Sequence, residues 1–209
     1  MKVLIACEYS GAVRDEFIKL GHDAVSCDLL PTDVTGPHYQ GDVFDIINDG
    51  WDMMIAFPPC THLALSGSQW FKEKIADGRQ QEALQFVRDL MNAPIEKIAI
   101  ENPIGIISTQ IRKYDQIIQP YYFGDPFQKS TCLWLKNLQP LVATNMVEKG
   151  EFKEFVNAKG QKKKQPMWYY EALKSGKDRW KIRSQTFPGI AKAMAEQWSG
   201  PQTIQTKLF

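Results

Sequence analysis

The chain has 209 residues, of which 44% are hydrophobic and 23% are charged, enough apolar side chains for the core of one medium-sized domain. This composition excludes fibrous, collagen-like and wholly disordered proteins. Apolar runs such as Val3 to Ala6 end far short of the roughly 20 residues that cross a bilayer, and no signal-peptide pattern opens the sequence. We therefore expect a soluble cytoplasmic protein that has no membrane partner.

The formal net charge of +1 hides a separation of charge along the chain. The segment from Lys149 to Arg183 contains 11 Lys and Arg against 4 Asp and Glu, a net charge of +7, so the other residues together carry −6. Basic and aromatic side chains in one segment favour phosphate contact and base stacking, with a solvated lysine-rich loop as the alternative. The candidate nucleic-acid-binding residues are Lys162, Lys163, Lys164, Trp168, Tyr169 and Arg183.

The first 40 residues have the pattern of a β-α-β unit. The apolar run from Lys2 to Cys7 predicts a buried strand, and a turn through Gly11 follows it. Apolar residues between Val13 and Leu20 recur at helical spacing, and Ala24 to Cys27 predicts a second strand. The segment from Leu30 to Gln40 has two prolines and no period, so we expect a loop.

Strands and helices continue to alternate up to about residue 135. Trp51 to Phe57 and Ile95 to Ile100 predict buried strands, the second stopped by Glu101-Asn102-Pro103, and Phe71 to Asn92 predicts a long amphipathic helix between them. Two further strands are expected at Tyr121 to Phe123 and at Thr131 to Leu135. The alternation predicts an α/β fold with a mostly parallel sheet that is flanked by helices and binds ligands at the carboxyl ends of its strands.

The chain divides into three expected parts. Residues 1–139 form the α/β core, residues 140–183 a small basic inserted lobe, and residues 184–209 a return to the core through a helix from Ile190 to Trp198.

Two residues at strand ends are candidates for chemistry. Cys60 follows two prolines that fix the backbone, so its thiol is held in one direction and is suited to act as a nucleophile. Glu101 follows an apolar strand, where a raised pKa would allow it to donate a proton. The other cysteines, Cys7, Cys27 and Cys132, are assigned to packing, and because no CxxC pair occurs we expect reduced thiols and no metal site.

Asp28 closes the second predicted strand, where nucleotide-binding α/β proteins place an acid on ribose hydroxyls. His62 lies two residues after Cys60, but no third group is evident to orient it. A hydrolase or metal site is therefore disfavoured.

Several short motifs follow one another along the chain. They are Tyr9-Ser10-Gly11, Asp28, Gly41-Asp42-Val43, Pro58-Pro59-Cys60, Glu101-Asn102-Pro103, the segment from Phe123 to Thr131, and that from Thr186 to Ala195. Taken in this order, they resemble the motifs of the DNA cytosine-5 methyltransferase family, and the overall pattern is similar to the small cytosine methylase-like proteins of bacteriophages and prophages. The chain has Val13 where the family usually has a further glycine, Thr61 where it has Gln, and Lys129 where it has the first of two arginines.

The resemblance implies a Rossmann-like methyltransferase of the bacterial host cytoplasm that uses S-adenosylmethionine and acts on DNA. Cys60 would add to C6 of a flipped cytosine, Glu101 would hold or protonate N3, and Asn102 would position the loop. Lys129 would join the catalytic residues. The implied donor-binding residues are Tyr9, Ser10, Gly11, Asp28 on the ribose, Asp42 on the adenine amino group, Val43 and Pro58.

Two alternatives remain open. The altered glycine loop and the missing Gln after Cys60 favour a methylase-like protein that binds DNA or a partner without turnover. The short recognition segment leaves room for the same thiol chemistry on RNA or a free nucleotide, or with a modified donor.

Overall fold

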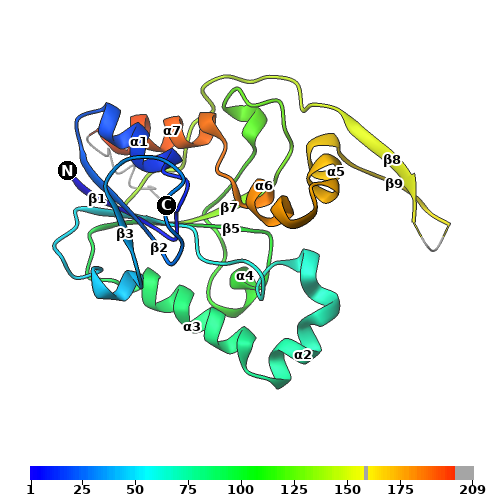
Figure 1. Ribbon diagram of the computed structural model, residues 1–209, viewed down its shortest axis with the longest axis horizontal. Helices are drawn as coiled ribbons and strands as arrows, with labels where there is room; N and C mark the ends of the chain where they lie inside the picture. The colour runs from blue at the N-terminus through cyan, green and yellow to red at the C-terminus, as the bar shows by residue number, and fades with distance from the viewer. Residues whose placement is uncertain (158–159, 201–209) are drawn as a thin grey trace, which may run out of the picture.

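The computed structural model describes residues 1–157 and 160–200, and within them seven strands form one mixed sheet (Figure 1). The strands lie in the order β3-β2-β1-β4-β5-β7-β6. Their bounds are β1 Lys2–Ala6, β2 Asp23–Asp28, β3 His38–Gln40, β4 Met53–Ala56, β5 Lys97–Pro103, β6 Gln116–Ile118 and β7 Thr131–Lys136. Strands β3, β2, β1, β4 and β5 are parallel neighbours, whereas β7 runs antiparallel to both β5 and β6. The predicted α/β class with a mostly parallel sheet is confirmed.

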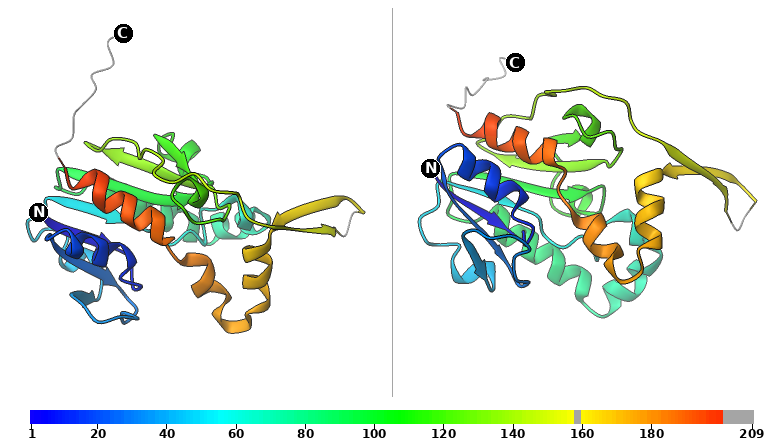
Figure 2. Two further views of the ribbon diagram at one scale, coloured as in Figure 1. Left: turned by 90° about the horizontal axis from the view of Figure 1, so that it is seen from above. Right: turned by 45° about the horizontal axis from the view of Figure 1, so that its top comes forward.

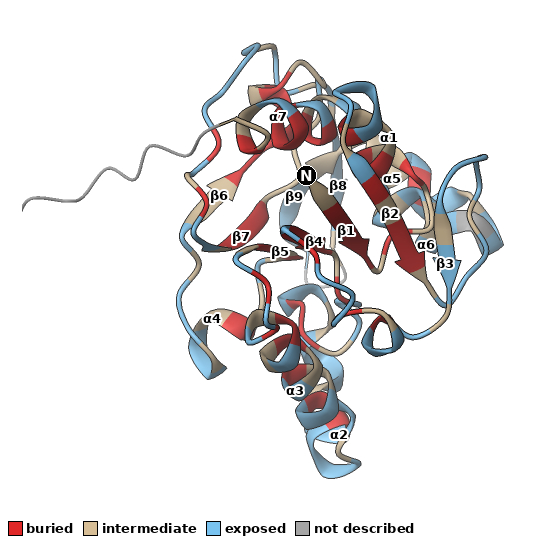
Figure 3. Ribbon diagram, turned by 90° about the vertical axis from the view of Figure 1, so that its left-hand side faces the viewer, coloured by how far each residue is buried: buried red, intermediate tan, exposed pale blue. Residues whose placement is uncertain are grey.

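Helices cover both faces of the sheet (Figure 3). On one face, α1 (Ala12–Lys19) and α7 (Pro188–Trp198) pack on β1 and β4 through Phe17, Met194 and other buried apolar side chains. On the other face, α3 (Arg79–Met91) and α4 (Ile107–Gln110) bury Leu84, Val87 and Ile107 against β4 and β5. Strand residues therefore alternate between two apolar cores, which explains the continuous apolar runs of the central strands.

A hairpin and two helices follow the sheet. They comprise β8 (Phe152–Val156), β9 (Lys162–Pro166), α5 (Met167–Lys174) and α6 (Arg179–Ser184). The hairpin projects from the body of the molecule, while α5 and α6 lie beside the edge at which the parallel strands end (Figures 1 and 2). The remaining elements are α2 Phe71–Ala76 and the 3-10 turns η1 Val43–Asp45, η2 Leu65–Trp70, η3 Pro120–Tyr122 and η4 Gly176–Asp178.

The long helix expected from Phe71 to Asn92 is wrong, because α2 and α3 are separate. Gly78 between them has φ +84°, a left-handed conformation that ends α2 and turns the chain into α3. The loop expected from Leu30 to Gln40 is wrong in its last part, where His38–Gln40 pairs with β2 as an edge strand.

The elements around β5 also differ from expectation. Glu101-Asn102-Pro103 continues β5 rather than stopping it, because β7 pairs with it as far as Pro103 and Thr131. Tyr121 to Phe123 is not a strand, since Pro120 begins the 3-10 turn η3, and the strand in this region, β6, comes earlier. Of the expected third part, residues 201–209 lie outside the described residues.

Candidate active site

The predicted catalytic residues gather at the carboxyl edge of the sheet. Cys60 follows β4, and Glu101 and Asn102 lie near the end of the neighbouring β5. Lys129 comes to the same edge because β7 runs in the opposite direction, so that Thr131 at its start pairs with Pro103 at the end of β5. In open α/β sheets this edge is where ligands bind.

A tight turn holds Cys60. Its carbonyl accepts hydrogen bonds from the backbone N–H groups of Leu63 and Ala64, at 3.0 and 2.9 Å. On the other side of the cysteine, the side-chain amide of Asn102, itself buried, donates to the carbonyl of Pro58 at 2.7 Å. This hydrogen bond ties the end of β5 to the loop that carries Cys60.

The Cys60 thiol lies among three charged groups. Desolvation by the surrounding protein atoms raises the pKa of the thiol and the charge of Glu101 raises it further, while Lys129 and Arg183 lower it. The Cys60 residue as a whole is nevertheless exposed to solvent. An incoming substrate that neutralises Glu101 would leave two cations to stabilise the thiolate.

Glu101 is placed to hold a proton. Desolvation raises the pKa of its carboxyl group, while the charge of Lys129 and a hydrogen bond with Thr131 oppose that shift. The expectation of a raised pKa at this strand end agrees with this environment.

Lys129 also ties the sheet to the end of α6 and the residue that follows it. Its ammonium donates to the carbonyls of Arg183 at 3.1 Å and Gln185 at 3.2 Å. The same cation lies 5.7 Å from the centre of the Phe187 ring. Lys129 thus connects the start of β7 to the end of α6, the part of the chain that carries Arg183.

A cavity of about 460 Å³ adjoins this loop on the side of β1, β2 and α3. Three predicted donor-binding residues, Asp28, Asp42 and Val43, line it, together with Pro59 next to Cys60. Its apolar walls include Leu29, Ala83 and Phe86, and its size is that of a small-molecule site.

Negative charge dominates this cavity. Burial and the charges of Asp28 and Asp42 raise the pKa of Cys27 to about 12. Arg79 lines the cavity but is paired with Glu73 at 2.8 Å and with Asp77, whereas Glu82 adds a further acid. The sequence missed Arg79, Glu82 and Phe86, which face the cavity because the chain bends at Gly78; that glycine between two helical patterns was the available signal.

The other four predicted donor-binding residues do not line this cavity. The carbonyl of Pro58 is used by Asn102. Tyr9 instead packs on α6, where its ring centroid lies 5.8 Å from that of Trp180 and its hydroxyl lies 3.4 Å from the Ser184 hydroxyl. An ion pair of 2.8 Å between Asp33 and Lys181 strengthens this contact.

Ser10 and Gly11 immediately precede α1, and the side chain of Glu8 occupies the N-terminus of this helix. The buried Glu8 carboxylate accepts the N–H of Val13 at 2.8 Å and that of Arg14 at 3.4 Å, and the Ser10 hydroxyl at 3.3 Å. Gly11 has φ +72°, and a Cβ there would lie 2.4 Å from the Arg14 guanidinium. The helix N-terminus that binds phosphate in many nucleotide-binding folds is therefore occupied by the protein itself.

The sequence assigns the other three cysteines to packing; two of them are buried, although one of these, Cys27, also lines the cavity. Cys27 and Cys132 are buried, and burial together with the charge of Glu101 raises the pKa of Cys132 to about 11. Cys7 is not inside a strand as expected: it follows β1 with φ +58° and lines the cavity.

The predicted nucleic-acid-binding residues fall into two groups. Lys162, Lys163 and Lys164 are exposed on β9, and because side chains alternate along a strand, Lys162 and Lys164 share one face of the hairpin while Lys163 lies on the other. Lys164 also lies over the ring of Phe152, 5.2 Å from its centre. These lysines are free of any carboxylate pair among the residues that the structure describes.

The second group lies at the base of the lobe. Trp168 donates to the carbonyl of Gln128 at 3.1 Å and packs edge-on against Phe187, so this indole anchors the lobe to the core. Arg183 lies over the Tyr169 ring, 5.0 Å from its centre. The charge of Arg183 also acts on the Cys60 thiol, whereas Trp168 packs against the core.

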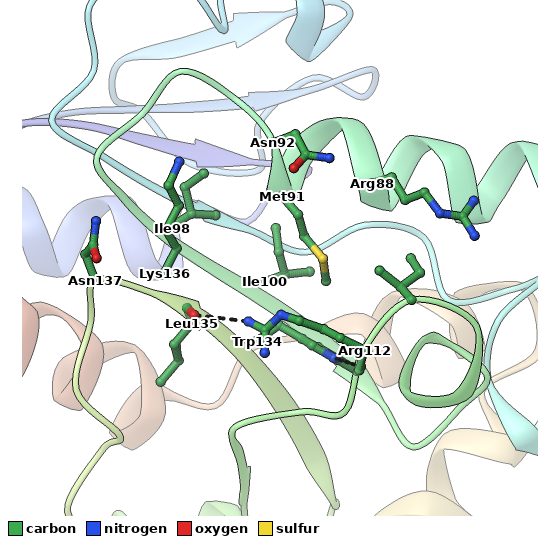
Figure 4. A pocket seen from close by; sticks show the side chains of 11 residues that line it. Arg88, Met91, Asn92, Ile98, Ile100, Arg112, Trp134, Leu135, Lys136 and Asn137 are labelled. Atoms are coloured by element: carbon green, nitrogen blue, oxygen red, sulfur yellow. Dashed lines mark hydrogen bonds between the residues drawn. The ribbon is translucent and has the colours of Figure 1, made fainter. Parts of the chain in front are cut away.

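A second cavity, of about 520 Å³, lies at the opposite edge of the sheet, between the end of α3 and β7 (Figure 4). The three cationic side chains that line it each donate a hydrogen bond to a backbone carbonyl of the protein. Arg88 donates to the carbonyl of Gln110, Arg112 to that of Leu135, and Lys136 to that of Ala93. They hold neighbouring segments together and do not converge on one point (Figure 4).

Residues 1–157 and 160–200 contain no group of three or more His, Cys, Asp or Glu that could hold a metal ion. The same residues include no helix with both the length and the apolar character that crossing a membrane requires. No protein-family model matches the chain, and no curated protein matches it at a significant level.

Proposed function

We propose that the protein is a DNA cytosine-5 methyltransferase that uses S-adenosylmethionine. The main support for the proposal is that Cys60, Glu101 and Lys129 lie close together at one edge of the sheet. An acidic cavity large enough for a nucleoside lies beside them. A thiol next to a proton-holding acid is what addition to a pyrimidine ring requires.

The cavity favours a donor without phosphate groups. Glu8 occupies the N-terminus of α1, and Asp28, Asp42 and Glu82 give the cavity a negative potential that repels phosphates. S-adenosylmethionine has no phosphate and carries a positive sulfonium. Asp28 would accept hydrogen bonds from ribose hydroxyls and Asp42 from the adenine amino group, with Val43 against the adenine.

The chain's own residues can carry the reaction on the base. The Cys60 thiolate adds to C6 of cytosine while Glu101 gives a proton to N3, which makes C5 nucleophilic. S-adenosylmethionine supplies the methyl group as an electrophile. Loss of the C5 proton to a base then expels the Cys60 thiolate, Glu101 takes back the N3 proton, and the aromatic ring is restored. Lys129 and Arg183 stabilise the thiolate before addition and after release.

The basic hairpin supports DNA as the substrate. C6 is inaccessible in a stacked duplex, so the base must leave the helix, and Lys162 to Lys164 would hold the backbone meanwhile.

A second candidate, a protein that binds DNA or a partner without turnover, is favoured by the position of Tyr9. Its ring packs on Trp180 rather than lining the cavity. A third, the same chemistry on another nucleic acid or with a modified donor, shares every catalytic residue.

The deciding experiment is nucleoside mass spectrometry on cytosine-containing DNA incubated with S-adenosylmethionine. The wild type and the control Cys132→Ala should form 5-methylcytosine and Cys60→Ser should not. If none of them forms it although calorimetry shows that the donor binds, methylation of DNA is rejected. RNA, free nucleotides and altered donors are then assayed in the same way, and inactivity on all of them favours the binding protein.

A further inference from the structure

The loop around Cys60 is held through its carbonyl groups by side chains from three elements. Besides Asn102 from β5, Lys74 of α2 donates to the carbonyl of Thr61 at 2.6 Å. Gln80 of α3 donates to the carbonyl of His62 at 3.3 Å. Asn102, Lys74 and Gln80 are all buried. Buried side chains therefore hold the backbone carbonyls on both sides of Cys60 by hydrogen bonds.

Lys74 is an unusual residue for this task. It is 7% exposed, and no carboxylate of the described part of the chain pairs with it. Its ammonium lies beside Gly67, where a Cβ would be 3.4 Å from Nζ. Burying an unpaired ammonium is unfavourable, so the lysine is not placed there by the hydrophobic effect.

The carbonyl of Thr61 does not need Lys74 to be satisfied. Thr61 is exposed, so water could take the place of the ammonium. What Lys74 adds is a fixed direction for the peptide that follows Cys60, and hence a fixed loop. Its charge is not among those that shift the pKa of the thiol, which come from Glu101, Lys129 and Arg183.

We propose that Lys74 is a positioning residue that holds the Cys60 loop in its reactive conformation through the Thr61 carbonyl. The proposal deepens the methyltransferase function proposed above and rests on it for its kinetic consequence. The loop geometry itself can be tested without any turnover.

The first measurement is hydrogen exchange at the amides of Leu63 and Ala64, which bond to the Cys60 carbonyl. Lys74→Met removes the donor and keeps the aliphatic stem, Lys74→Arg keeps a charged donor, and Lys72→Met is the matched control, an exposed lysine on the same helix. We expect exchange to be about 10-fold faster in Lys74→Met and close to wild type in the other two. Unchanged exchange in Lys74→Met overturns the proposal, whether or not the protein methylates DNA.

The second measurement separates positioning from stability and charge. In Lys74→Met we expect kcat to fall by about 10- to 100-fold, with the donor KM and the alkylation pKa of the Cys60 thiol unchanged, and Lys74→Arg to restore kcat. A shifted thiol pKa would show that the charge acts on the sulfur. An unchanged kcat with a lower melting temperature would show that Lys74 only stabilises the fold. Either outcome overturns the positioning role, whereas absence of methylation in the wild type refutes the proposed function and leaves the exchange result to decide on the loop.

Discussion

The carboxylate of Glu8 accepts the backbone N–H of Val13 at 2.8 Å, so a buried acid closes the first turn of α1. Burial raises the pKa of this carboxyl group against the lowering effect of its hydrogen bonds. Folded protein therefore holds the Glu8 proton to higher pH than unfolded protein does. Protonation of Glu8 therefore stabilises the folded state. This contribution is fully present below the pKa of Glu8 in the unfolded protein and is lost as the pH rises through its pKa in the folded protein.

Glu8→Gln should remove this pH dependence and keep an acceptor for the helix. We expect the free energy of unfolding of the wild type, relative to Glu8→Gln, to be greater at pH 4.5 than at pH 8 in urea titrations. Glu8→Ala, which removes the acceptor, should lose about 1–2 kcal/mol at pH 7. A difference between wild type and Glu8→Gln that grows with pH would contradict this assignment.

Asn102→Ala should weaken both the fold and the reaction. The carbonyl of Pro58 loses its buried partner, which costs about 1–3 kcal/mol. Urea unfolding measures this loss, and single-turnover methylation should slow because the loop of Cys60 is released. Asn48→Ala, at an exposed position, is the control and should change neither quantity.

The pH dependence of the reaction should identify Glu101 as the acid. Addition needs a protonated Glu101 and an ionised Cys60, so the wild-type rate should be level between the two pKa values and fall outside them. In Glu101→Gln the rate should be lower near neutrality and rise about tenfold per pH unit up to the thiol pKa, because only the thiolate fraction then varies. That thiol pKa should itself fall once the Glu101 charge is gone. Single-turnover rates between pH 5 and 10 test this, and identical profiles would remove Glu101 from the reaction.

The lysines of the hairpin should govern the salt dependence of DNA binding. Lys162→Gln combined with Lys164→Gln should make the log–log salt slope shallower by about 1.8 if both contact phosphates, with donor affinity unchanged. Lys163→Gln, on the other face of the hairpin, reports whether one face or both meet the DNA. Lys192→Gln on α7 serves as the control. An unchanged slope in the double variant would reject the hairpin as the nucleic-acid contact.

The contact between Tyr9 and Trp180 should stabilise the packing of α6 on the core. Trp180→Ala removes the aromatic partner of Tyr9, so we expect the free energy of unfolding to fall by about 0.5–1.5 kcal/mol in urea titrations. Donor affinity should stay unchanged in calorimetry, because neither Tyr9 nor Trp180 lines the cavity. Phe155→Ala, an exposed aromatic of the same lobe, is the control for both measurements. A donor affinity that falls in Trp180→Ala alone would show that Tyr9 takes part in donor binding.

The sequence predicted the positions of Cys60 and Glu101 at strand ends better than it predicted the helices and strands between and after them. Strand ends were visible because buried parallel strands are apolar along their length, so the polar residues after them, Cys60 among them, stood out. The alternation of strands and helices then placed Cys60 and Glu101 at one edge of the sheet. The motif resemblance, not periodicity, suggested Lys129 and Asp42.

The remaining features depend on tertiary contacts that have no local signature. The role of Glu8 requires the turn at Gly11 to bring the helix N-terminus back onto it. Lys74 resembles any surface lysine of an amphipathic helix until Thr61 is known to lie beside it. The sequence predicts base stacking for Trp168, whereas the indole packs against Phe187, a residue from a later element that no local pattern places beside it.

The reversed direction of β7 determines how far Lys129 lies from Cys60 and Glu101. Thr131 opens this six-residue strand opposite Pro103, and Lys136 closes it opposite Ile98. Had β7 been parallel to β5, its first residue would lie at the other edge of the sheet, about 20 Å away. One change of strand direction thus places Lys129, two residues before β7, at the edge of the sheet where β4 and β5 end.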